Sequence, residues 1–258
     1  MPVRGHETRH RRSVGGVGAP RASRVAACEP GGVEFDAVVR GRRMVRDFDP
    51  APLPEPMLRR ALERALRAPS AGFSQGLDLV LLVAPEDRDR FWTATVDAEA
   101  AAPGSGPRSR WLTGVRRAPA LIVVCSDPGA YVRRYARADK AVTGYGAGVD
   151  AWPIPYWDVD AGMAALLLLL GAVDDGIGGL FFGVPPARHD AVRAALAIPA
   201  GRRLVGVVAL GRPRADAARP GSRGGSHRPD RRPFEEVVHV GRFARHPPQG
   251  RAGAAPPV

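Results

Sequence analysis

The longest apolar run in the chain lies between Asp158 and Gly183, and it predicts a helix around which the rest of the protein is organised. Residues 161–173 are all Ala, Gly, Met, Leu or Val, so this helix is apolar on every side and belongs in a core. Asp158 or Asp160 is expected to cap its start, since aspartate accepts hydrogen bonds from free helix amides. The run is shorter than the roughly 18 residues that a membrane span needs, so we predict the central helix of a soluble domain.

Shorter patterns on both sides of this run predict buried strands and amphipathic helices. Strands are expected at residues 77–83, 120–127 and 202–213, because these apolar runs lack the polar alternation of a solvated face. Glycine-rich residues 176–183 and a loop at 142–157 flank the central helix. Helices are expected at residues 33–43, 58–68, 85–100, 111–117, 130–140 and 185–196.

Several side chains are expected to face the core from these helices. Leu58, Leu62 and Leu66 recur at four-residue intervals and predict one buried stripe. The first helix is expected to bury its apolar side chains, which are Phe35, Val38 and Val39, and the helix after residue 85 is expected to bury Phe91, Trp92 and Val96.

Length and composition favour one domain with two tails. The chain has 258 residues and 45% hydrophobic content, which suits one large core. We predict a disordered basic extension at residues 1–32, a folded domain at 33–243 and a disordered tail at 244–258. Residues 1–32 contain no apolar stretch of about 7 to 15 residues, so a secretory signal is not indicated and a cytoplasmic protein is expected.

The net charge of +12 does not by itself indicate nucleic-acid binding. Residues 1–32 carry six arginines and two glutamates, and residues 212–258 carry ten arginines and four acidic residues, so the excess lies mostly at the ends. Lys140 is the only lysine among 38 basic residues, which indicates a compositional bias toward arginine rather than a selected surface. Cys28 and Cys125 are too few for a disulfide framework and fit a reducing compartment.

Two segments near the start of the domain carry candidate chemistry. Arg42, Arg43 and Arg46 are close enough in sequence to surround one anion, and guanidinium groups suit a phosphate. A solvated run of charge is the alternative for these residues alone. The loop at residues 69–75, PSAGFSQ, offers a hydroxyl, a side-chain amide and main-chain amides to a flat polar ligand.

Together these segments resemble the FMN-dependent nitroreductase family. RRMVRDF at residues 42–48 resembles the family's arginine-rich first element, and APSAGFSQGL at residues 68–77 resembles the loop that follows its first helix. The resemblance implies an α+β fold with three layers, in which helices flank a central, largely antiparallel sheet. It also implies an obligate homodimer that binds one FMN at each of two interface sites.

The resemblance assigns expected roles to specific residues. Arg42, Arg43 and Arg46 would hold the FMN phosphate and ribityl chain, with a main-chain contact at Met44, and Arg231 and Arg232 would form a second phosphate clamp before a closing strand at residues 237–240. The remaining expected cofactor contacts are Ser70, Gln75, Phe181, Phe182 and Gly183. Met44 replaces a common serine and Phe73 a common asparagine, so two polar contacts of the family are missing.

The loop before the central helix is expected to border the substrate. Phe73, from the earlier loop, and four rings of the 142–157 loop are candidates for the substrate face of the flavin: Tyr145, Trp152, Tyr156 and Trp157. The alternative is a loop that is anchored by its own aromatic side chains.

By this resemblance the protein is an oxidoreductase in which FMN takes a hydride from NAD(P)H and passes electrons to a small nitro, quinone or related acceptor in a ping-pong order. No catalytic side chain and no metal ligand is assigned. A degenerate flavin-binding or cofactor-free homologue, and a relative that uses deazaflavin or modifies flavin, remain alternatives.

Two further patterns have little support. Gly72, Ser74 and Gly76 form GxSxG, but a nucleophile elbow needs a strand before it and a helix after it, whereas the order expected here is the reverse. The glycines at 144, 146 and 148 follow no strand, so a dinucleotide loop is not expected.

Overall fold

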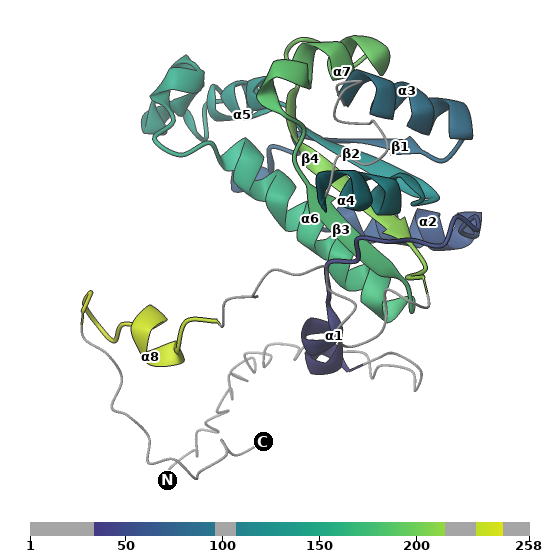
Figure 1. Cartoon of the computed structure of the whole chain (residues 1–258). Helices are drawn as coiled ribbons and strands as arrows, with labels where there is room; N and C mark the ends of the chain where they lie inside the picture. Colours follow the sequence, from purple (N-terminus) through teal and green to yellow (C-terminus); the bar gives the residue numbers. More distant parts are fainter. Residues whose placement is uncertain (1–33, 96–106, 215–230, 245–258) are drawn as a thin grey trace, which may run out of the picture.

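A computed structural model of the protein describes residues 34–95, 107–214 and 231–244 (Figure 1). The disorder predicted for residues 1–32 falls outside the described residues, and so does that predicted for the tail, apart from Ala244. Val96, which was expected to face the core, also lies outside them.

An antiparallel sheet of four strands forms the middle layer, with the strand order β1-β2-β4-β3. The central strand β2 is buried along its whole length, and successive side chains enter opposite cores, as Leu121 and Ile122 do. A strand covered on both faces needs no polar positions, which explains its unbroken apolar sequence. The strands are β1 (Leu77–Leu82), β2 (Ala120–Ser126), β3 (Gly178–Phe182) and β4 (Arg203–Gly211).

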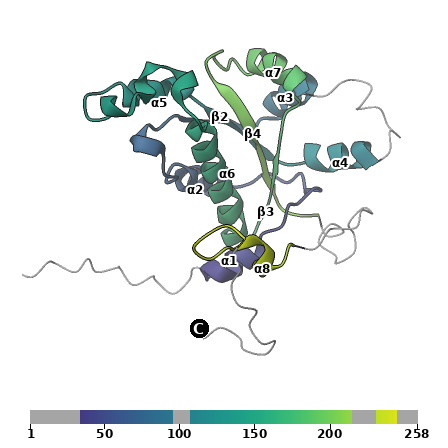
Figure 2. The same cartoon turned by 90° about the vertical axis from the view of Figure 1, so that its left-hand side faces the viewer.

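Helices cover both faces of the sheet, as Figure 2 shows from the side. One face packs against α3 (Pro85–Thr95), α4 (Pro107–Arg116) and α7 (His189–Ala195). The other face packs against α2 (Glu55–Ala65) and α6 (Tyr156–Asp174). The predicted α+β architecture with helices around an antiparallel sheet is therefore confirmed.

The predicted central helix is α6, which lies along the sheet beside α2. It begins at Tyr156 after Pro155, so Asp158 and Asp160 lie inside the helix and do not cap it. At its other end the amide of Ile177 donates to Ala172 O (2.8 Å) and the amide of Gly176 to Val173 O (3.0 Å). With Gly176 at φ 70°, these bonds form a Schellman motif that ends the helix.

One face of α6 is exposed although its sequence is apolar all round. Val159, Met163 and Leu166 are 39%, 42% and 48% exposed, whereas Ala164 and Leu168 on the other side are fully buried. By length and composition α6 is the one helix of the described residues that could cross a membrane. It packs along the sheet as a core helix instead, which is consistent with a soluble protein.

Three expectations about burial were wrong. In α1 (Phe35–Gly41) only Val38 is buried, while Phe35 and Val39 are exposed, because this helix touches the body on one side, mainly at α6. Leu66 is exposed because α2 ends before it, and Ala61 and Ala65 fill the buried stripe. β1 is half-buried because it lies at the edge of the sheet.

The remaining segments project from the layered body. After β2 the chain forms α5 (Pro128–Tyr135) and then short 3₁₀ turns at Ala141–Thr143, Tyr145–Ala147 and Val149–Ala151. Two more 3₁₀ turns in the described part of the chain are Ala71–Phe73, before β1, and Pro186–Arg188, before α7. The closing strand expected at residues 237–240 is not formed: the short helix α8 (Phe234–Val237) ends at the first of these residues, and the other three are in neither a helix nor a strand. Figure 1 shows α8 away from the sheet.

Candidate functional site

The arginine-rich segment runs along the free edge of β3. Met44 forms a parallel bridge to Gly179, and the amide of Val45 donates to Gly179 O (3.0 Å). Phe48 is fully buried and anchors the far end of the segment. The segment is therefore held in place by main-chain bonds and one ring.

Arg42 has an unsatisfied donor. Its Nη1 atom is buried and has no hydrogen-bond partner among the described residues. Arg43 Nη1 donates to Arg40 O (2.7 Å), and Arg46 Nη1 donates to Met44 O (3.2 Å), so both of these exposed side chains are held by the main chain. A buried guanidinium nitrogen without a partner is costly, and an anion such as the FMN phosphate would satisfy it.

The loop at residues 70–75 is strained and firmly held. Phe73 and Gln75 have φ of 55° and 52°, which is unfavourable for residues with a Cβ atom. Ser70 Oγ accepts a hydrogen bond from the amide of Gln75 (3.1 Å), so the hydroxyl predicted to face the flavin also closes the loop. Phe73 is 74% exposed and Gln75 is exposed, so both side chains are free to meet a ligand.

A buried carboxylate on α6, which its sequence position predicts only as a possible cap, fixes this loop. Asp160 Oδ2 accepts hydrogen bonds from the amide of Ala71 (2.8 Å) and from the hydroxyl of Tyr131 (2.6 Å). Burial and the bond to Asp160 raise the pKa of Tyr131, which therefore stays protonated and donates. An acid in an otherwise apolar helix was the available signal, because a buried carboxylate needs partners.

The two predicted halves of the cofactor site lie at opposite ends of α6. Gly41 approaches Val173 near the C-terminal end, whereas Ala71 bonds Asp160 near the N-terminal end. Thirteen residues separate these two positions, which corresponds to about 20 Å along a helix. A single chain therefore does not bring Arg42 to the 70–75 loop.

At the end of β3 the structure separates residues that were predicted as neighbours on the flavin. The Phe182 ring stacks on Trp92 with centroids 5.7 Å apart and lies near Trp111, so this partly buried ring packs against the core. The Phe181 ring lies over Gly206 on the other face. Gly183 is exposed, and a Cβ atom there would meet nothing within 4 Å, so its main chain remains open to a ligand.

The aromatic loop packs largely on itself. Trp152 and Trp157 are 7% and 6% exposed and form a cluster with Tyr131. Trp152 Nε1 donates to Tyr145 O (3.0 Å), and the Tyr145 ring lies against Trp152. Tyr156 is 37% exposed, so it is the most accessible of the four rings predicted to face the substrate from the 142–157 loop.

Arg231 and Arg232 lie on the segment that carries α8. Both are exposed, and Arg232 donates to Glu236 O (3.0 Å) on the same segment. Figure 1 shows α8 well apart from α1 and from the Arg42 segment that follows it. Within one chain these arginines and Arg42 do not meet.

The GxSxG pattern does not form a nucleophile elbow. Ser74 lies between α2 and β1, and its hydroxyl donates to Ala71 O (2.6 Å). This order of helix, loop and strand is the one the sequence predicted. Within residues 34–95, 107–214 and 231–244, no group of three or more His, Cys, Asp or Glu side chains is placed to hold a metal ion.

Comparison with known proteins relates this architecture to flavin enzymes. A model of the nitroreductase family matches residues 39–212. A nitroreductase family protein from Clostridium difficile 630 superposes with a TM-score of 0.57 at 16% identity, and the match covers 82% of this chain and all of that one (100%). NADPH:FMN oxidoreductase from Vibrio harveyi, complexed with NAD+, gives a TM-score of 0.55 at 19% identity over 81% of this chain and 77% of that one. Nitroreductase A from Vibrio parahaemolyticus RIMD 2210633 gives a TM-score of 0.55 at 21% identity, and the match covers 81% of this chain and 76% of that one.

These similarities to solved structures show the fold, which is that of the nitroreductases. The match over residues 39–212 further shows that this chain belongs to the nitroreductase family. Membership of this family supports a flavin-dependent oxidoreductase in general.

Proposed function

We propose that this protein is an FMN-dependent oxidoreductase that passes electrons from NAD(P)H to a small nitro, quinone or related organic acceptor. The observation that carries this proposal is the buried, unpartnered Nη1 of Arg42, at the start of the segment that resembles the family's phosphate-binding element. A cationic donor in that state is matched by a phosphate, which would satisfy its hydrogen-bonding capacity.

The residues proposed to hold FMN come from three parts of the chain. Arg42, Arg43 and Arg46 would bind the phosphate, and the main chain at Gly183 leaves room for a flat ring. The exposed Gln75 and the Phe73 ring would face the ligand from the strained loop. The strain at Phe73 and Gln75 favours this assignment, since unfavourable backbone geometry is often kept for binding.

When bound, FMN supplies the redox chemistry by accepting a hydride from NAD(P)H and then reducing the acceptor, in a ping-pong order. The chain's own residues bind and orient the partners of this reaction. Asp160 keeps the loop in place through Ala71 and keeps the Tyr131 proton on the phenol. The packed rings of Trp152 and Trp157 brace the neighbouring loop, with Tyr156 at its accessible side.

We further propose that the working form is a homodimer in the cytoplasm. The Arg42 segment and the 70–75 loop lie about 20 Å apart along α6 in one chain, and two antiparallel α6 helices would bring the loop of one copy to the arginines of the other. The exposed apolar face of α6 at Val159, Met163 and Leu166 supports contact with a second copy.

The test is identification and titration of the flavin. Purified protein is denatured and the released molecule is identified, and FMN is then titrated into apoprotein while flavin fluorescence is recorded. Because Arg42 would contribute a charge-assisted bond to the phosphate, Arg42→Gln is expected to weaken FMN binding about tenfold or more.

Arg40→Gln is the matched control, since it removes the same charge from an exposed pair with Asp36 only. We expect this variant to bind FMN like the wild type. Absence of flavin in the purified protein together with no binding of added FMN would contradict the proposal, as would equal losses in the two variants. Oxidation of NAD(P)H with a nitro or quinone acceptor then tests the reaction itself.

A further inference from the structure

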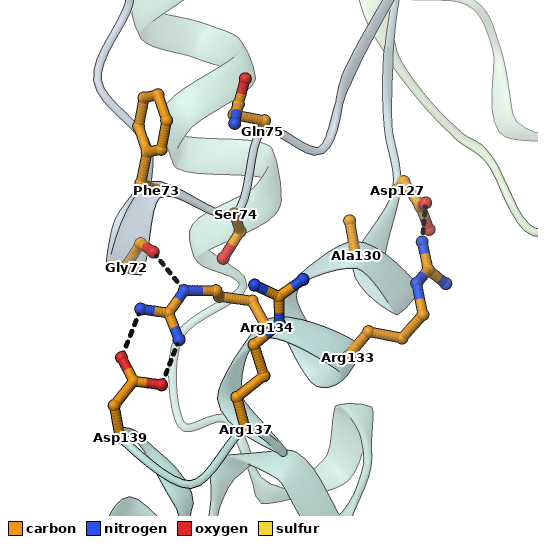
Figure 3. Close-up of a pocket in the computed structure, with 10 residues that line it drawn as sticks. All are labelled: Gly72, Phe73, Ser74, Gln75, Asp127, Ala130, Arg133, Arg134, Arg137 and Asp139. Atoms are coloured by element: carbon orange, nitrogen blue, oxygen red, sulfur yellow. Dashed lines mark hydrogen bonds and ion pairs between the residues drawn. The ribbon is translucent and has the colours of Figure 1, made fainter.

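A basic cavity lies between the 70–75 loop and the helix that follows β2. It has a volume of about 610 Å³, and it is lined on one side by residues 72–75 and on the other by α5 and the turn after it (Figure 3). Three arginines line it, namely Arg133, Arg134 and Arg137, against two carboxylates, Asp127 and Asp139. Positive charge is therefore in excess within a concave site.

Arg134 is fixed as part of the cavity wall. Its Nε donates to Gly72 O (2.8 Å), and its two terminal nitrogens donate to the carboxylate of Asp139 (2.9 and 2.7 Å). This bidentate pair raises the pKa of Arg134 and lowers that of Asp139. Arg134 thus ties α5 to the strained loop and has no charge left over for a ligand.

Arg133 is also paired, and its partner is shared. Asp127 accepts from Arg133 Nη2 (2.9 Å) and lies 3.1 Å from Arg202 Nη1. One carboxylate therefore faces two guanidinium groups, although Arg202 also pairs with Asp78. Both carboxylates that line the cavity are therefore engaged with arginines other than Arg137.

Arg137 is the cavity arginine that pairs with neither of the two lining carboxylates. Among the described residues no carboxylate pairs with its guanidinium, and Figure 3 shows that group directed into the cavity toward Ser74. The Ser74 side chain points to the lower side of the loop, on which this guanidinium lies, whereas Phe73 and Gln75 point to the upper side. The cavity therefore adjoins the side chains proposed to face the flavin, because Phe73 and Gln75 flank Ser74 in the same loop and line the cavity with it.

We propose that this cavity is an oxyanion subsite, in which Arg137 binds a carboxylate or phosphate carried by one of the enzyme's two substrates. The inference rests on the proposed function and extends it, because it assigns a negatively charged group to the acceptor or to the nicotinamide donor. Arg134 and the 70–75 loop form the rigid wall of the cavity, and the planar guanidinium of Arg137 supplies the paired N–H donors that recognise the oxyanion.

The experiment uses the full-length purified protein and two pairs of probes that differ in one charged group. The acceptor pair is 4-nitrobenzoate and its neutral methyl ester. The donor pair is NADP+ and NAD+, which differ by the 2′-phosphate and do not reduce the flavin. Binding of each is measured by isothermal titration calorimetry for the wild type, Arg137→Gln, Arg137→Lys and Arg90→Gln, and KM is then measured for the acceptors and for NADPH and NADH.

Arg137→Gln is expected to weaken binding of the pair member that carries the extra anionic group, the benzoate carboxylate or the 2′-phosphate, about three- to tenfold. Binding of the member that lacks this group should stay within about twofold, as is reasonable for one partly solvated charge-assisted contact. The pair that responds identifies which substrate carries the oxyanion. Arg137→Lys should keep part of the affinity that Arg137→Gln loses, because lysine retains the positive charge but lacks the paired N–H donors of the guanidinium. Arg90→Gln removes the same charge from a surface pair with Asp87 and should have no effect.

Equal effects of Arg137→Gln on the two members of each pair, or the same effect from Arg90→Gln, would overturn the subsite. If charged probes bind through Arg137 but the wild type catalyses no NAD(P)H oxidation, the subsite stands and the proposed function fails. If turnover is normal but no probe distinguishes Arg137→Gln from the wild type, the proposed function stands and the subsite fails.

Discussion

Cys125 is buried near the end of the central strand, and its environment keeps it in the thiol form. Burial, and then the neighbouring charge of Asp78, raise the pKa of Cys125 to about 11 from 9.0. At neutral pH the thiol is therefore protonated and packs as a small apolar group beside Leu204 and other core residues of that face.

This pKa shift predicts a loss of stability at high pH. Below pH 9.0 the thiol is protonated in both the folded and the unfolded protein, and its contribution to the free energy of unfolding is fully present. Above pH 9.0 the thiol of the unfolded protein ionises first, so this contribution is lost as the pH approaches about 11. The difference in unfolding free energy between wild type and Cys125→Ala should shrink by about 1 kcal/mol from pH 7 to pH 10. Urea unfolding of both proteins at the two pH values measures it. A difference that does not change with pH would contradict this account.

Met44 shows why one departure from the family pattern is compatible with the fold. Its side chain is half-buried and packs against both hydrophobic clusters, while its main chain forms the bridge to Gly179. A serine there would offer a hydroxyl to a ligand, whereas methionine fills the gap at the edge of β3. The main-chain contact predicted for Met44 stays a prediction.

The element that organises the molecule is α6, because three other segments depend on its two ends. Asp160 near the start holds the strained loop and Tyr131. At the end, Arg64 from α2 donates to Gly171 O (3.0 Å) and to Asp175 (2.9 Å), and it pairs with Asp174 at 2.6 Å. The helix thus links α2, α5 and the loop before β1 through its few polar atoms.

The Schellman motif that ends α6 gives a prediction about the stability of this helix. Gly176 has φ 70°, and a Cβ atom added there would meet nothing within 4 Å, so Gly176→Ala should lower stability through backbone strain alone, by about 1 kcal/mol. Gly201→Ala is the control, since it too meets nothing within 4 Å but has no positive φ, and it should change stability by less than about 0.5 kcal/mol. Chemical denaturation compares both with the wild type. Equal changes in the two variants would show that the left-handed geometry does not matter.

At the scale of the whole molecule, the outward face of α6 leads to a prediction about assembly. Met163 and Leu166 are exposed although they belong to the most apolar helix of the chain. If two copies pack through this face, placing charges there leaves unpaired carboxylates in a dry interface, which is strongly unfavourable. Met163→Glu with Leu166→Glu is therefore expected to give a monomer and to remove most FMN binding.

Analytical ultracentrifugation measures the mass, and FMN titration measures the loss of the cofactor. Val142→Glu is the control, because Val142 is 96% exposed on a turn and should remain in the wild-type assembly. A double variant that keeps the wild-type mass, or a wild type that is already monomeric and binds FMN, would refute the homodimer.

The sequence by itself determined the elements whose residues share one environment along their length. The unbroken apolar runs identified β2 and β4, because a strand covered on both faces needs no polar positions. They also identified α6, although one face of that helix is exposed. The motif at residues 42–48 and the loop at 68–77 identified the family, which the match over residues 39–212 then showed.

Only the tertiary structure decided which parts of these motifs meet. Sequence spacing did not reveal that Arg42 and the 70–75 loop lie at opposite ends of α6. It also did not reveal that the Phe182 ring stacks on Trp92, or that Asp160 accepts a hydrogen bond from the 70–75 loop. It also left Arg137 as one of many arginines, although it is the one in this cavity without a carboxylate among the described residues. The physical reason is that burial and charge pairing depend on neighbours brought from distant positions, whereas a pattern along the chain reports only the local environment that each residue requires.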